Sequence, residues 1–123
     1  MLTLPPSVRI YVAISPCDMR KSFRGLTGWV RLRLAEDPLS GHIFCFINRR
    51  KNMMKCLVHD RSGMLIYYKK LSRGTFELPP ASDGTAKVQI DAGTLALILE
   101  GIDLKSVQRR VRHHRKDLPP IEN

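Results

Sequence analysis

At 123 residues, 43% of them hydrophobic, the chain is long enough to bury one modest core and too short for a separate catalytic lobe, so we expect a single domain. Its 21 Lys and Arg residues outnumber 11 Asp and Glu residues, which gives a formal charge of +10. An ordinary cytosolic enzyme has a net charge near zero, so this excess argues against that class of protein and indicates a polyanionic partner. Three cysteines cannot all pair, the N-terminus lacks the features of a secretory signal, and no apolar run approaches the roughly 20 residues that cross a bilayer, so the sequence predicts a reduced, cytoplasmic protein with no membrane association.

The first predicted elements are a strand and a helix. Residues 8–14 are β-branched and aromatic and lie between proline-containing turns, which predicts a strand. Asp18 is then a good N-cap for a helix. The apolar stripe of that helix comprises Met19, Phe23, Leu26, Val30 and Leu34. In this prediction Arg20, Lys21 and Arg24 crowd the first turn, where the helix dipole favours acidic residues, so we expect a phosphate to bind there.

The middle of the chain predicts an antiparallel meander. Its strands are expected at residues 42–47, 54–59 and 64–70, with a last strand at 86–90. The link "NRRKN" is long and basic, whereas "DRSG" predicts a tight hairpin turn with Gly63 at a positive φ. Asp91 is the predicted N-cap of a short helix through "AGTLALILEG".

The C-terminal stretch carries a separate helical pattern. Asp103 is its predicted N-cap, followed by a thin apolar stripe at Leu104, Val107 and Val111. Lys105, Arg109, Arg112 and Lys116 lie on one side of this pattern. Together the patterns predict an α+β fold in which a small antiparallel β-sheet packs against one or two helices. We expect residues 1–104 to form the domain and residues 105–123 to form a basic C-terminal helix or tail.

Ligand-type residues occur in two matching pairs, His42 with Cys45 and Cys56 with His59. Zinc accepts these residue types, but residues three apart in a strand point to opposite faces, so the four side chains do not easily converge. The acidic residues lie mostly at cap and turn positions rather than in the carboxylate cluster that a two-metal nuclease needs. The sequence therefore predicts no metal, no cofactor and no catalytic residue.

The basic residues form four clusters. They are Arg20, Lys21 and Arg24; Arg49, Arg50, Lys51 and Lys55; Lys69, Lys70 and Arg73; and Arg109, Arg110, Arg112, Arg115 and Lys116. Any one cluster is equally well explained as a solvated face, but four together indicate contacts with nucleic-acid phosphates. Tyr67 and Tyr68 adjoin the third cluster, and by alternation one faces the core and the other faces outward, where it stacks on a base or pairs across strands.

Three stretches, "CDMRKSFRGL", "DPLSGHIFCFINRRKNMMKCLVHDRSGMLIYYKKLSRGTFELP" and "LALILEGID", carry a family resemblance. Together, from about Val8 to Asp103, they resemble the accessory transposition protein TnpB of the insertion-sequence-66 family of bacterial mobile elements. The RNA-guided nuclease of the same name is a different and far larger protein. Arg24 departs from the pattern, because the family usually has an acid there.

The resemblance implies a non-catalytic helper encoded beside a separate transposase. With the charge, it predicts a protein that binds DNA, either element ends or non-specific duplex, through phosphate contacts and assists that transposase. Two alternatives stay open: a protein–protein adaptor for the transposase, which needs an exposed apolar patch or groove, and an RNA-binding regulator of the element. The sequence leaves the oligomeric state open.

Overall fold

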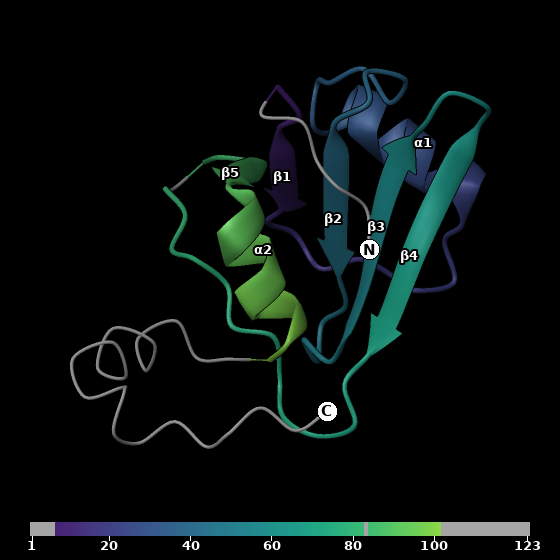
Figure 1. Cartoon of the computed structure of the whole chain (residues 1–123). Helices are drawn as coiled ribbons and strands as arrows, with labels where there is room; N and C mark the ends of the chain where they lie inside the picture. Colours follow the sequence, from purple (N-terminus) through teal and green to yellow (C-terminus); the bar gives the residue numbers. More distant parts are fainter. Residues whose placement is uncertain (1–6, 83, 102–123) are drawn as a thin grey trace.

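The computed structural model describes residues 7–82 and 84–101, which form a five-stranded sheet with one helix on each face (Figure 1). The elements in chain order are β1 (Ile10–Ala13), α1 (Phe23–Leu32), β2 (Ile43–Ile47), β3 (Met53–His59), β4 (Met64–Lys70), β5 (Lys87–Ile90) and α2 (Ala92–Leu99). The predicted α+β class is confirmed, and every predicted strand is present with its ends shifted by at most two residues. None of the described helices is long and apolar enough to span a membrane.

The sheet has the strand order β4-β3-β2-β1-β5 and is antiparallel except for one pair. β2, β3 and β4 form the predicted meander, with Cys45 opposite Cys56 and Cys56 opposite Tyr67. β1 pairs with β2 in parallel, and α1 is the crossover between them. The carboxyl ends of β1, β2 and β4 therefore lie at the same edge of the sheet.

Two apolar layers separate the sheet from its helices. Leu26, Trp29 and Val30 of α1 pack on one face of the sheet, whereas Leu95 and Ile98 of α2 pack on the other. All residues of β1 and β2 are buried, as expected for central strands that are covered on both faces. The core thus holds the two central strands in place, and the loops at their ends begin from fixed positions.

The predicted start of the first helix is wrong. The helix begins at Phe23, with Ser22 as an N-cap that makes no side-chain cap hydrogen bond. Asp18 closes a turn ahead of the helix instead, because its Oδ1 accepts the backbone N–H of Arg20 at 2.9 Å and its carbonyl accepts that of Lys21 at 3.0 Å. Phe23, placed in the buried stripe by the pattern, is 45% exposed.

The predicted positive φ at Gly63 is also wrong. In the described part of the chain the glycines with positive φ are Gly41, Gly74, Gly84 and Gly101. The β3–β4 turn is held by Asp60, whose Oδ1 accepts the backbone N–H groups of Ser62 and Gly63, each at 3.0 Å. The turn therefore closes with no residue of positive φ between Asp60 and Gly63.

The second helix follows its prediction. Asp91 is its N-cap, and the Asp91 carboxylate accepts the backbone N–H of Thr94 at 2.7 Å. Gly101, at a φ of +75°, follows the helix in the left-handed conformation that commonly ends helices. The predicted C-terminal helix, the boundary at residue 104 and the extension at 105–123 lie outside the described residues.

Candidate nucleic-acid interface

Three of the four predicted basic clusters lie at one edge of the sheet. The loop after β1, the turn after β2 and the segment after β4 follow the three carboxyl ends that share this edge (Figure 1). We call this set of exposed cations the basic edge. It comprises Arg20, Lys21, Arg24, Arg49, Arg50, Lys51, Lys70 and Arg73.

The loop between β1 and α1 presents Arg20 and Lys21 of the first cluster, and Arg24 follows in the first turn of α1. The Arg20 guanidinium donates to the Asp18 carboxylate at 2.7–3.1 Å, yet the Arg20 side chain stays 92% exposed. These hydrogen bonds and that from the Arg20 backbone N–H lower the pKa of Asp18 to about 2. Asp18 is therefore ionised at neutral pH and orients Arg20, while the adjacent Lys21 has no carboxylate within ion-pair distance among the described residues.

Lys55 of β3, a buried member of the second predicted basic cluster, holds this loop in place. Its side chain crosses from β3 so that Nζ donates to the carbonyls of Met19 at 2.7 Å and Lys21 at 2.6 Å. The residue is 8% exposed, and its ammonium also lies 4.7 Å from the centre of the Tyr68 ring. The Lys55 ammonium is therefore used in contacts within the fold, and we leave this residue out of the basic edge.

The turn between β2 and β3 presents the second cluster, and hydrogen bonds of the Asn48 side chain hold this turn in place. Asn48 Oδ1 accepts the backbone N–H groups of Asn52 and Met53, each at 3.0 Å, and Asn48 Nδ2 donates to Asn52 Oδ1 at 2.8 Å. Lys51 takes a φ of +60°, a conformation that is uncommon for residues other than glycine. The turn is thereby fixed, with Arg49, Arg50 and Lys51 outward.

An open concavity joins these two loops. It has a volume of about 390 Å³ and is lined by Cys17, Asp18, Met19, Asn48, Arg49, Arg50 and Met53. Segments about thirty residues apart in the chain thus face one depression with cations at its rim. Backbone contact keeps them in place, because the Cys17 N–H donates to the Ile47 carbonyl at 2.8 Å.

The third cluster adjoins the same turn. The Leu71 N–H donates to the Asn52 carbonyl at 2.8 Å and the Phe76 N–H donates to the Lys51 carbonyl at 2.6 Å, so the segment that holds Lys70 and Arg73 runs beside the β2–β3 turn. Lys69 differs from Lys70, because alternation turns it to the α2 face, where its ammonium lies 4.0 Å from Glu100. The fourth predicted cluster, from Arg109 to Lys116, lies outside the described residues.

The expectation for the two tyrosines is corrected. Tyr67 and Tyr68 point to opposite faces of β4, but both are about half exposed, at 47% and 51%. Neither is core, because β4 is the outermost strand of the described sheet and neither helix covers it completely. The Tyr68 hydroxyl donates to the Met53 sulfur at 3.3 Å, so its ring lies next to the concavity.

The pairs of ligand-type residues are used in other contacts. Cys45 and Cys56 are cross-strand partners whose sulfurs lie 3.4 Å apart, and the hydrogen bond from Cys56, together with burial, raises the pKa of the Cys45 thiol. His42 Nδ1 accepts the Arg9 backbone N–H at 2.9 Å. Within residues 7–82 and 84–101, no three His, Cys, Asp or Glu side chains gather as a metal site requires.

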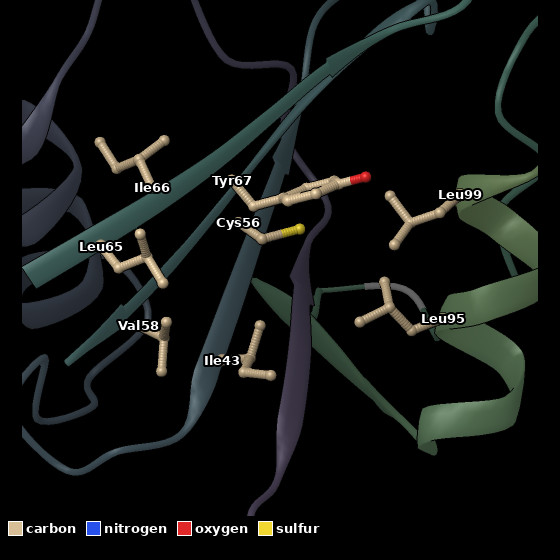
Figure 2. Close-up of a pocket in the computed structure, with 8 residues that line it drawn as sticks. All are labelled: Ile43, Cys56, Val58, Leu65, Ile66, Tyr67, Leu95 and Leu99. Carbon is tan, nitrogen blue, oxygen red and sulfur yellow. The ribbon is translucent and has the colours of Figure 1, made fainter. Parts of the chain in front are cut away.

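An apolar groove on the opposite face was not predicted from the sequence. Leu95 and Leu99 of α2 face Tyr67 and Leu65 of β4 across a space of about 210 Å³ (Figure 2). The remaining lining residues are Ile43, Cys56, Val58 and Ile66. Each resembles an ordinary core residue in the sequence, so only the incomplete cover of β4 by α2 reveals the groove.

Comparison with known proteins relates the sequence of this chain to one family. Residues 8–109 match the family model described as IS66 Orf2-like protein. Two relatives from Sinorhizobium fredii are both named as uncharacterized proteins. One, y4jC, is 35% identical over 103 residues, covering 84% of this chain and 86% of the relative. The other, y4hO, is 33% identical over 112 residues, covering 91% and 96%. No solved structure matches the chain.

Proposed function

The chain belongs to the IS66 Orf2-like family, whose members accompany insertion sequences, and on that premise we propose that it is a non-catalytic accessory protein that binds duplex DNA along its basic edge. In this role it assists a separate transposase of the same element, in the cytoplasm where the DNA lies. The observation that carries the proposal is the convergence of three basic segments on one edge of the sheet. Exposed cations at fixed spacing neutralise phosphates without reading base sequence.

Three acidic residues of the described part of the chain have structural uses, which supports a non-catalytic role. The carboxylates of Asp18, Asp60 and Asp91 accept backbone N–H groups in a loop, a turn and a helix cap. Carboxylates committed in this way are spread over separate ends of the fold rather than gathered to hold catalytic ions.

The test is a fluorescence-anisotropy titration of a labelled duplex across a salt series. Replacing Arg49, Arg50 and Lys51 by Gln should flatten the slope of log affinity against log salt by about two to three units, since each neutralised phosphate contributes roughly 0.9. The control replaces Arg9, Arg31 and Arg61, which are exposed and away from the basic edge, and should leave the slope unchanged. Equal slopes for both triple variants would refute the proposed interface.

A second candidate function is that of an adaptor for the transposase, and the apolar groove favours it. A groove walled by Leu95, Leu99 and Tyr67 suits the apolar side of a partner helix. Pull-down with the transposase, with and without DNA, separates the two functions. Capture without DNA that a Leu99→Glu variant loses would support the adaptor, whereas capture only with DNA would support the basic edge alone.

A further inference from the structure

The outer edge of β4 is free of partners among the described residues. β4 pairs with β3 on one side only, and Figure 1 shows it as the outermost strand of the sheet. It has seven residues, against four in β5 at the other edge. Natural proteins protect long edge strands with charges, proline or bulges, but here the run from Met64 to Tyr68 is apolar or aromatic throughout.

The direction of the free backbone groups on β4 follows from its pairing with β3. The bonds from Leu71 N–H to Asn52 and from Asp60 N–H to Gly63 show that the odd-numbered residues of β4 bond inward. Met64, Ile66, Tyr68 and Lys70 therefore direct their N–H and C=O groups away from the sheet. A strand added at this edge must pair with these residues.

We propose that β4 pairs with β4 of a second copy, antiparallel about a two-fold axis at Ile66. In this register Ile66 faces Ile66 of the second copy, and Met64 faces its Tyr68. The backbone groups of these three residues are the ones that point away from β3 and can pair with the second copy. On the groove face, Leu65 lies opposite Tyr67 of the second copy. Every apolar side chain from Met64 to Tyr68 thus meets another apolar one.

The charges of β4 fit the same register. Lys69 and Lys70 fall opposite Gly63 and Ser62 of the second copy, next to its Asp60 carboxylate, so no two lysines oppose each other. Moving the two-fold axis to Tyr67 would place Lys70 against Met64 and reduce the number of apolar pairs. The segment is therefore complementary to itself in one register, which favours a second copy over a foreign strand.

The pairing covers side chains that the single chain leaves exposed. Leu65 is 40% exposed, and the two tyrosines are about half exposed. A two-fold axis normal to the sheet puts the α1 helices of both copies on one face and the two basic edges at opposite ends. If the proposed DNA binding holds, on which this consequence alone rests, the dimer suits two separate duplex segments.

Light scattering on the full chain without DNA tests the dimer independently of DNA binding. The native chain should be dimeric, and Ile66→Lys, which brings two ammonium groups together at the axis, should raise the dimer dissociation constant at least about 100-fold. Gln89→Lys on β5 makes the same charge change at the other edge and should remain dimeric. A native chain that is monomeric throughout, or a dimeric Ile66→Lys variant, would overturn the proposal.

Disulfide trapping tests the register even if Ile66→Lys folds poorly. In a Cys56→Ala background, Leu65→Cys with Tyr67→Cys places thiols in directly opposed, non-hydrogen-bonded positions, with Cα atoms about 4.5 Å apart. Mild oxidation should convert most of this variant to a covalent dimer. Tyr67→Cys alone should remain unlinked, because its diagonal separation exceeds disulfide reach. No linkage in the double variant, or equal linkage in the single one, would contradict the register.

Discussion

The basic edge and the apolar groove differ in their side chains, which are charged at the first and apolar at the second. The basic edge consists mostly of loops, and partly buried hydrogen bonds of Lys55 and Asn48 hold the backbone of those loops in place. The groove consists of one helix and regular strands, and its side chains are extensions of the core. Charge at the first and packing at the second are therefore separable, and substitutions should affect them independently.

The largest expected effect is a loss of stability when a leucine that lines the groove is truncated. Leu95 is 4% exposed and joins α2 to the sheet, so Leu95→Ala should lower the free energy of unfolding by about 2–5 kcal/mol. DNA affinity of the folded fraction should not change. Leu39→Ala, at a leucine that is 56% exposed, serves as the control for urea unfolding and should cost little. A parallel loss of DNA affinity in folded Leu95→Ala would show that the two regions are not independent.

A smaller effect is expected at the support of the basic edge. Lys55→Met keeps the aliphatic chain but leaves the carbonyls of Met19 and Lys21 without their donor, which should cost about 1–3 kcal/mol. The loop should then hold Arg20 less firmly and bind DNA more weakly. Lys51→Met, on the exposed turn, should weaken DNA binding with little loss of stability. If Lys55→Met weakened DNA binding with unchanged stability, Lys55 would instead contact DNA directly.

Lys55 and Asp18 also show which parts of the site the sequence predicts. The basic clusters are visible as runs of Arg and Lys, and the strand pattern places Arg49 to Lys51 in a turn correctly. The helix start is misplaced because the local pattern at Asp18 carries no information about the Lys55 ammonium, which binds the carbonyl of Met19 from 36 residues along the chain. Convergence on one edge depends on the parallel β1–β2 pair, a long-range choice that periodicity does not encode.

The groove was not predicted because nothing in the sequence distinguishes its residues from ordinary core residues. Its residues come from β2, β3, β4 and α2, and each satisfies the pattern of a buried position. Whether such residues are covered depends on the position of α2, which lies over the sheet but leaves the β4 side open (Figure 1). Sequence reasoning identifies apolar residues but not the places where a short helix fails to cover them.

The smallest expected effect is a pH dependence at the basic edge. The pKa of Asp18 is about 2, below the ordinary value of roughly 3.9, so its ionised form stabilises the fold. That contribution is complete above about pH 4 and is lost as pH falls through the folded value. Asp18→Asn should therefore melt below the native chain at pH 6, and the gap should close near pH 2 in a thermal melt. A gap that stayed constant with pH would exclude this carboxylate as its source.

The most direct test of the basic edge is a ¹⁵N–¹H NMR titration of the full chain with a short duplex. The account predicts that amide shifts concentrate at residues 18–24, 48–52 and 70–74, with few changes at Leu95 and Leu99 across the molecule. Shifts confined to α2 and the groove face of β4, with residues 18–24 and 48–52 unperturbed, would contradict it.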